Sequence, residues 1–197
     1  MASSDEATPA GRLRVEVTYL EMLAPGPPAP AAPQPNLSVG LIAAPSVALY
    51  RFLYDTVGEP WLWGDRRRMT DEAIEAIILD PHVAIHVLSV GDQPAGFAEL
   101  DGRVGAGIQL AYFGILPDYI GQKLGPWLLA RALNEAWAQK PGRVTVNTCT
   151  LDHPAALATY ERAGFAPYRR VTEFYPDPRI EGLVPRRAAP HIPLAET

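Results

Sequence analysis

The 197-residue sequence has a single cysteine, Cys149, which excludes an internal disulfide framework and any metal cluster built on cysteine. Its four histidines form no strong metal motif either. His82 and His86 are four residues apart, but they lie in or beside a strand-like run, where this spacing does not give the shared helix face of a metal-binding pair. We therefore expect no bound metal.

The first ten residues lack the basic start and the apolar core of a signal peptide, and no apolar run is long enough to span a bilayer. Positive charge is also scarce, because 17 Lys and Arg residues face 22 Asp and Glu residues, for a net charge of −5. Such a chain has no broad surface to neutralise the phosphates of a nucleic acid. We expect a cytoplasmic protein that binds neither nucleic acid nor a membrane.

Hydrophobic residues make up 48% of the sequence and charged residues 20%, which is typical of a globular protein. The length suffices for one sizeable core. We divide the chain into a disordered tail (1–11), a single domain (12–176) and a C-terminal tail or arm (177–197). A proline- and alanine-rich linker (24–36) inside the domain should be extended. This linker and the arm could wrap a partner subunit, so a homodimer stays open.

Hydrophobic periodicity and turn residues predict one strand, two helices, three antiparallel strands, and then helix, strand, helix and strand. The expected ranges are 12–23, 45–57, 71–79, 83–90, 94–100, 107–116, 126–139, 144–150, 153–163 and 165–174. The strands at 107–116 and 144–150 should lie parallel, because a helix joins them. The predicted fold is therefore α/β of the α+β type, with a mixed, mostly antiparallel central sheet of six to seven strands flanked by helices.

The stretch from Tyr112 to Leu129 carries the strongest functional signal. It runs from a strand through a loop with Gly121 and Gly125 into a helix that we expect to begin at Pro126. The first backbone N–H groups of a helix have no partner within it, and the helix dipole adds partial positive charge there. This turn therefore predicts a site for the pyrophosphate of a nucleotide-like cofactor.

Two segments resemble the GNAT superfamily of N-acetyltransferases, and the resemblance extends over residues 12–174. The loop from Ile120 to Gly125 stands where the family has Gln/Arg-x-x-Gly-x-Gly/Ala, with Ile120 replacing Gln/Arg and Lys123 replacing the first glycine. Residues 153–165 match the family pattern Asn-x-x-Ala-x-x-x-Tyr-x-x-x-Gly-Phe in every position but the first, which is His153.

The resemblance implies the acyl-CoA N-acyltransferase fold, with acetyl-CoA as the co-substrate and no metal. Backbone amides of residues 121–125 would bind the pyrophosphate, and main-chain groups of residues 113–115 would pair with the pantetheine arm. The expected cofactor-binding residues are Phe113, Gly114, Ile115, Gly121, Gln122, Lys123, Leu124, Gly125, Pro126, His153 and Tyr160.

The resemblance also suggests catalytic residues. Tyr160 stands at the family's tyrosine position and would protonate the departing thiolate, although it could instead anchor its helix to the sheet. Glu99 is the carboxylate best placed to act as a base, although a surface-facing glutamate and a water chain are alternatives. The expected acceptor-binding residues are Trp61, Trp63, Tyr112 and Asn147, where the tryptophans could also serve only to pin their loop to the core.

These features together predict an N-acetyltransferase that moves an acetyl group from acetyl-CoA to a primary amine of a small molecule. The amine would attack directly within a ternary complex. A catalytically silent acyl-CoA-binding regulatory module and the acetylation of a protein or peptide amine stay open as alternatives. A dinucleotide-binding oxidoreductase is disfavoured, because the sequence lacks a Gly-x-Gly-x-x-Gly turn.

Overall fold

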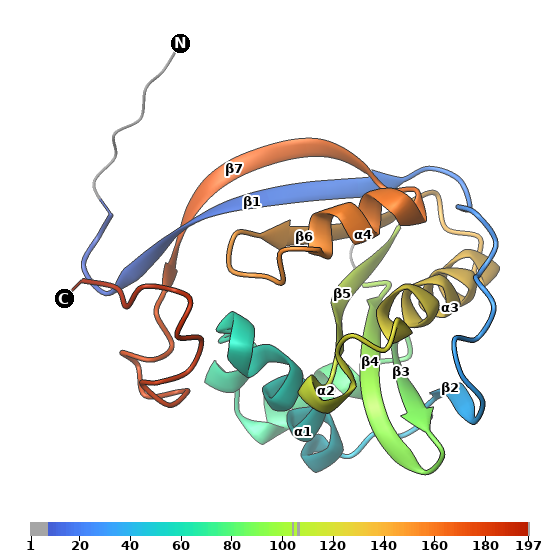
Figure 1. The fold of residues 1–197 in the computed structure, drawn as a ribbon, viewed down its shortest axis with the longest axis horizontal. Helices are drawn as coiled ribbons and strands as arrows, with labels where there is room; N and C mark the ends of the chain where they lie inside the picture. The colour runs from blue at the N-terminus through green and yellow to red at the C-terminus, as the bar shows by residue number, and fades with distance from the viewer. Residues whose placement is uncertain (1–7, 104, 106, 197) are drawn as a thin grey trace.

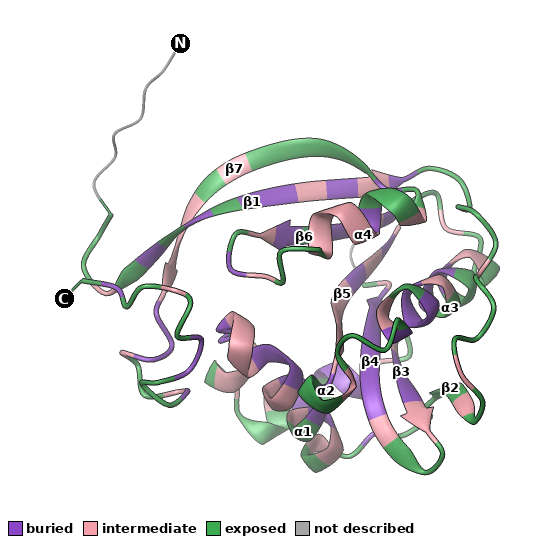
Figure 2. Cartoon of the chain, viewed as in Figure 1, coloured by how far each residue is buried: buried purple, intermediate pink, exposed green. Residues whose placement is uncertain are grey.

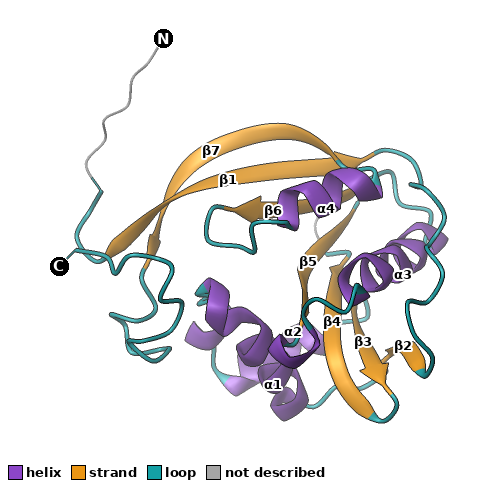
Figure 3. Cartoon of the chain, viewed as in Figure 1, coloured by secondary structure: helices purple, strands orange, loops and turns teal. Residues whose placement is uncertain are grey.

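The computed structural model describes residues 8–103, 105 and 107–196, so most of the expected N-terminal tail lies outside the described residues (Figure 1). Within these ranges the chain forms a seven-stranded sheet flanked by four helices (Figure 3). The strands are β1 (Arg12–Met22), β2 (Leu37–Leu41), β3 (Val83–Val90), β4 (Gln93–Asp101), β5 (Ile108–Ile115), β6 (Val144–Cys149) and β7 (Ala166–Pro176). The helices are α1 (Val47–Gly58), α2 (Asp71–Ile78), α3 (Leu124–Ala138) and α4 (Ala156–Ala163).

The strands follow the order β2-β3-β4-β5-β6-β1-β7, and all neighbours are antiparallel except β5 and β6. Helix α3 connects these two parallel strands, so the predicted crossover is confirmed. The predicted fold class, a mixed and mostly antiparallel sheet flanked by helices, is confirmed as well. No helix in the described ranges is long and apolar enough to cross a membrane.

Two hydrophobic clusters cover the two faces of the sheet. Phe97 of β4 packs in one cluster with Tyr50 of α1 and Ile74 of α2. Its neighbour Ala98 packs in the other cluster with Leu128 of α3. Because successive residues of a strand point to opposite faces, α1 and α2 cover one face of the sheet while α3 and α4 cover the other (Figure 2).

Local sequence signals explain several helix boundaries. Ser46 begins α1, because its Oγ atom accepts a hydrogen bond from the backbone N–H of Leu49 at 3.2 Å. Thr70 begins α2 in the same way, as expected, with a 3.3 Å bond from the N–H of Ala73. Gly164 ends α4 with a φ of 105°, which confirms its predicted role as the C-terminal glycine of this helix.

Most bounds differ from the sequence-based expectation by one or two residues, and three differences have a clear local cause. Strand β2 was not expected, because its five residues contain Gly40 and give little strand signal of their own. It lies exposed at the edge of the sheet, where pairing with β3 determines its conformation. Helix α3 begins at Leu124 rather than Pro126, whose missing N–H is tolerated within the first turn. Helix α4 begins at Ala156, because the Nδ1 atom of His153 accepts a bond from the N–H of Ala155 and the chain turns there.

The C-terminal arm, residues 177–196, packs on this same chain rather than extending away from it (Figure 1, red). Its centre is a buried ion pair in which Nη2 of Arg179 lies 2.8 Å from Oδ2 of Asp177. The same guanidinium donates to the carbonyl oxygens of Ile192 and Pro193 at 2.8 Å. The arm also anchors the loop after α1, because Leu62 packs in its apolar cluster.

Candidate active site

A cavity of about 510 Å³ opens where β5 and β6 separate. These parallel strands pair only at Ile108 with Val144 and at Gln109 with Thr145, near the start of each strand. Beyond these residues the facing edge of β5 borders the cavity instead of a strand. The cavity brings together most of the predicted site residues: Trp61, Trp63, Tyr112, Phe113, Gly114, Ile115, Gly121, Lys123, Leu124, Gly125, Pro126, Asn147, His153 and Tyr160.

The loop before α3 adopts the left-handed backbone conformation at two of its residues. Gly121 and Lys123 both have positive φ angles, of 86° and 61°. No side chain caps α3, so its first backbone N–H groups are left to point towards the cavity end of the helix. Lys123 occupies a backbone conformation that glycine adopts without strain, which explains why the resembled family has a glycine there. Gln122 does not line the cavity, because its side chain donates to the carbonyl oxygen of Asp118 at 3.2 Å.

Strand β5 forms the long wall of the cavity. Gly114 lies so close to α1 that an added Cβ atom would overlap Cγ1 of Val57. This close approach places α1 directly behind the strand, and Phe113 and Ile115 flank the glycine along the cavity wall. An extended ligand lying against this wall would meet backbone groups that β6 leaves unpaired.

Tyr160, in the middle of α4, lies opposite Phe113 of β5. Its side chain is only 7% exposed and packs edge-on against Phe113 and Phe165, with ring centroids 6.2 and 5.9 Å apart. Burial raises the pKa of the Tyr160 hydroxyl, and the negative charge of Asp152 raises it further. The hydroxyl therefore stays protonated at neutral pH and can donate a proton or a hydrogen bond.

Aromatic side chains form the wall on the α1 side. The Trp63 ring packs against Tyr112 and Tyr54, with centroids 5.2 and 5.4 Å apart. Trp61 lies between two histidine rings, 5.2 Å from His153 and 5.5 Å from His191 of the C-terminal arm. The two tryptophans thus pin their loop and also line the cavity, and their binding of an acceptor stays a prediction.

Asp152 lines the same cavity, although sequence analysis did not select it. Its Oδ2 atom accepts bonds from Oγ1 of Thr148 at 2.8 Å and from the backbone N–H of Cys149 at 2.9 Å. Its Oδ1 atom accepts a longer bond, 3.3 Å, from Nε1 of Trp63. The sequence contains the signal Asp-His-Pro just before a helix, but it does not show that Trp63, distant in the chain, reaches this carboxylate.

Glu99 does not lie where a general base would be needed. Its side chain is fully buried, and it is not among the residues that line the cavity. Its Oε1 atom lies 2.7 Å from Nη2 of Arg66, and its Oε2 atom accepts a short 2.5 Å bond from the hydroxyl of Tyr50. The expectation that Glu99 faces the substrate is corrected: its carboxylate is neutralised within the α1 face of the sheet by Arg66.

Two further strand residues face the cavity from β6. Asn147 lines the cavity, and its Oδ1 atom accepts a hydrogen bond from Nε2 of Gln109 at 3.3 Å. Cys149 is partly buried beside Asp152, and burial together with that negative charge raises the pKa of its thiol to about 12. Cys149 is therefore an unreactive thiol at neutral pH.

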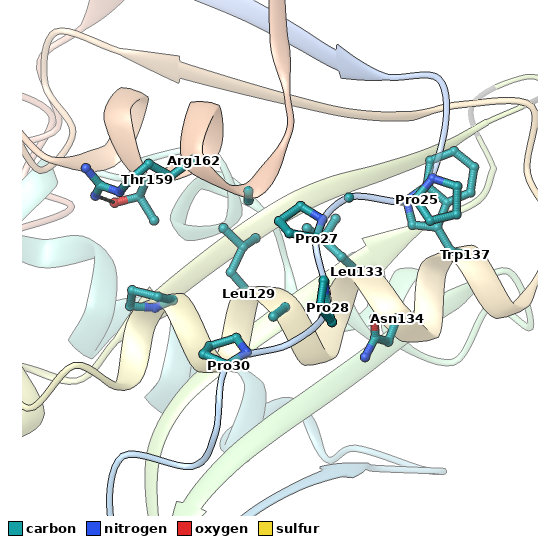
Figure 4. A pocket seen from close by; sticks show the side chains of 14 residues that line it. Pro25, Pro27, Pro28, Pro30, Leu129, Leu133, Asn134, Trp137, Thr159 and Arg162 are labelled. Atoms are coloured by element: carbon teal, nitrogen blue, oxygen red, sulfur yellow. Dashed lines mark hydrogen bonds between the residues drawn. The ribbon is translucent and has the colours of Figure 1, made fainter.

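A second groove lies next to the cavity, along α3 (Figure 4). Its walls are α3, the outer side of α4 and the proline-rich linker, whose Pro27 and Pro30 face Leu129. Pro126 and Thr159 line both this groove and the central cavity, so the two spaces are neighbours. Arg162 stands at the α4 side of the groove, where its guanidinium donates to Oγ1 of Thr159 at 3.2 Å.

In the described part of the chain, no three His, Cys, Asp or Glu side chains are grouped so that they could hold a metal ion. The polar groups of the cavity are instead backbone amides, hydroxyls, an indole N–H and carboxylates. Such groups suit the binding of an organic ligand with a phosphate end.

A mixed sheet that opens beside the N-terminus of a helix defines an acyl-CoA N-acyltransferase fold. The sequence matches the acetyltransferase (GNAT) family over residues 47–165, which is more than half of the chain. The chain therefore belongs to the GNAT acetyltransferase family. No match was found among the curated proteins.

Solved structures support the fold. A GCN5-related N-acetyltransferase from Sphaerobacter thermophilus is similar with a TM-score of 0.62 and 14% identity, over 85% of this chain and 52% of that one. Another from Kribbella flavida has a TM-score of 0.56 and 16% identity, over 87% of this chain and 63% of that one. This chain thus spans less than two thirds of the length of either protein.

A shorter structure is also similar. An aminoglycoside acetyltransferase from an uncultured soil metagenomic sample, in complex with sisomicin, has a TM-score of 0.55 and 14% identity. The match covers 71% of this chain and 95% of that one. At these identities the likeness establishes a common fold and leaves the substrate of this chain to be argued from its own cavity.

Proposed function

We propose that this protein transfers an acetyl group from acetyl-CoA to a primary amine of a small molecule. One observation carries the proposal: a single cavity unites the glycine-containing turn at 121–125, the unpaired edge of β5 and Tyr160. These are the three features that thioester transfer requires, namely an anion site, a wall for an extended donor arm and a proton donor at the thiolate.

The donor would bind mainly through the backbone. The N–H groups at the start of α3 would donate hydrogen bonds to the pyrophosphate, while residues 113–115 would pair with the pantetheine arm. Lys123 is exposed at the loop and adds positive charge there. The nucleotide part of CoA would extend past Pro126 into the second groove, beside the proline-rich linker, where Arg162 supplies a positive charge.

Tyr160 would act as the general acid. Tyr160 lines the cavity, and its raised pKa keeps the proton on the oxygen at neutral pH, so that the hydroxyl can donate a hydrogen bond to the thiolate as it departs. Because Glu99 is locked in an ion pair, the proton lost by the amine would pass to solvent rather than to that carboxylate.

The acceptor would enter from the tryptophan side. The whole cavity, which would also hold the end of the donor, falls in the size range of small-molecule sites, and this favours a small amine over a folded protein surface. A protein of similar fold carries sisomicin, a small-molecule ligand, which is consistent with this choice.

Two measurements test the proposal. Calorimetry should detect CoA binding, and thiol release from acetyl-CoA should require an added primary amine. CoA binding without thiol release from acetyl-CoA in the presence of any amine, peptides included, would support a silent binding module instead.

Tyr160→Phe should lower kcat at least about tenfold with little change in CoA affinity, since only the proton donor is removed. An unchanged kcat would leave Tyr160 with a packing role alone.

A further inference from the structure

Two carboxylates, Asp65 and Asp152, line the cavity on the side proposed for the acceptor. They differ in how exposed they are and in how many hydrogen bonds hold them. The side chain of Asp65 is 81% exposed at the cavity mouth, and its contacts with Arg68 and Tyr112 are both long, at 3.5 Å. Asp152 is half-buried and is held by three hydrogen bonds from Thr148, Cys149 and Trp63. Asp152 is therefore the fixed negative charge of this cavity.

The hydrogen bonds of Asp152 leave one side of the carboxylate free for a ligand. Oδ2 accepts two bonds, whereas Oδ1 accepts only the 3.3 Å bond from Trp63. A carboxylate offers about four acceptor positions, so Oδ1 can take another donor. In the part of the chain that the structure describes, no Lys, Arg or His side chain forms an ion pair with Asp152.

A partly desolvated negative charge without a cationic partner attracts a cation from the ligand. The surroundings fit an organic cation rather than a metal ion, because Trp61 and Trp63 add aromatic surface beside the carboxylate. The negative charge also reaches Tyr160, whose pKa it raises. A group bound at Asp152 would therefore lie near the proposed position of the thioester.

We propose that Asp152 binds the acceptor as its ammonium ion, which loses a proton to solvent before the neutral amine attacks the thioester, so that the site takes an organic primary amine whose apolar body lies against Trp61 and Trp63. The inference rests on the proposed function and extends it to the class of acceptor. It assigns to Asp152 the recognition of the amine, a role for which Glu99 is unavailable because Arg66 already neutralises it.

The test compares two ligands of similar shape and different charge. Phenethylamine carries an ammonium group at neutral pH, whereas phenethyl alcohol is uncharged. Calorimetry with the full chain, with and without CoA, should show that the wild-type protein prefers phenethylamine by about tenfold or more. In Asp152→Asn, which keeps the side-chain shape and removes the charge, this preference should disappear while CoA affinity changes less than about twofold.

Two control variants separate charge from packing. Thr148→Val removes one donor to Asp152 but keeps the carboxylate, so stability should fall while the preference for phenethylamine remains. Asp65→Asn removes the exposed carboxylate and should have little effect on the preference. A purely structural role of Asp152 would weaken both ligands equally in Asp152→Asn.

The outcomes also distinguish this inference from the proposed function. A wild-type protein that shows no preference for phenethylamine, or an Asp152→Asn variant that keeps the preference, would overturn the inference. If CoA fails to bind while the preference persists and depends on Asp152, the proposed function fails and the ammonium site stands. If CoA binds and amines are acetylated at equal rates by wild-type and Asp152→Asn, the inference fails and the proposed function stands.

Discussion

Trp63 donates a hydrogen bond from Nε1 to Oδ1 of Asp152 across 3.3 Å and thereby joins the loop after α1 to the loop before α4. The first loop also carries Trp61, and the second leads to Tyr160. This single bond therefore connects the wall proposed for the acceptor with the helix proposed to supply the acid.

Replacing this tryptophan tests the connection. Trp63→Phe keeps an aromatic ring but removes the N–H, so the free energy of unfolding should fall by about 1 kcal/mol. The kcat/KM for the acceptor should fall about fivefold, which is the factor that corresponds to a loss of about 1 kcal/mol in the transition state. The dissociation constant of CoA should stay unchanged. Trp127→Phe on α3, whose ring lies outside the cavity, is the matched control and should affect stability alone. An equal fall of kcat/KM in Trp63→Phe and Trp127→Phe would contradict a role of the hydrogen bond between Trp63 and Asp152.

Lys123 has two separable properties, its backbone conformation and its charge. Lys123→Gly should raise the free energy of unfolding by about 1 kcal/mol, because glycine adopts a φ near 61° without the steric cost that other residues meet. Lys123→Ala keeps the strained conformation and should not stabilise the protein. Urea unfolding measures the first effect. Calorimetry measures the effect of the charge on CoA binding. Both variants lack the positive charge and should bind CoA more weakly, and an unchanged affinity would remove Lys123 from the phosphate site.

Buried tyrosines predict a loss of stability at alkaline pH. Burial raises the pKa of Tyr54 to about 12, and it also raises the pKa of Tyr50, Tyr112 and Tyr160. Above about pH 10 the unfolded chain releases tyrosine protons that the folded chain keeps, so the free energy of unfolding falls as pH rises. Each tyrosine contributes up to about 1.4 kcal/mol per pH unit in this window.

Urea unfolding between about pH 9 and about pH 11 measures this slope. Tyr54→Phe should flatten it, although the variant will be less stable at neutral pH, because the backbone N–H of Arg66 loses its acceptor on the Tyr54 hydroxyl. A free energy of unfolding that stays constant across this range would show that these hydroxyls are not buried in the way described.

The buried ion pair of the C-terminal arm should dominate its stability. Arg179→Ala leaves Asp177 buried without its cation and strips the carbonyl groups of Ile192 and Pro193 of a donor, so we expect a loss of about 3 to 5 kcal/mol. Arg143→Ala is the control, since its 3.4 Å pair with Glu21 lies at the surface and should contribute less than about 1 kcal/mol. Similar losses in urea unfolding would contradict this account of the arm.

Local patterns in the sequence predicted much of the fold. Strand β3 has the predicted bounds Val83–Val90, and Thr70 and Gly164 mark the expected helix ends. These elements depend on alternation, capping and positive φ, which neighbouring residues determine. Strand β2 escaped prediction, because its conformation depends on pairing with β3 rather than on its own five residues.

The donor side of the site was easier to predict than the acceptor side. Residues of the β5 strand and the loop after it are contiguous in sequence, so a motif can reveal them. Asp152 and Glu99 depend instead on partners far along the chain, Trp63 and Arg66 respectively. The sequence does not show which carboxylate Arg66 neutralises, and this pairing decides which one is left for the ligand.

The central claim is that the cavity between β5 and β6 transfers acetyl groups to amines, and product analysis tests it most directly. Purified protein is mixed with isotope-labelled acetyl-CoA and a panel of primary amines, and mass spectrometry follows the label. The account predicts label in an N-acetylated amine with wild-type protein and much slower labelling with Tyr160→Phe. Intact acetyl-CoA and unlabelled amines throughout the panel, despite measurable CoA binding, would contradict it.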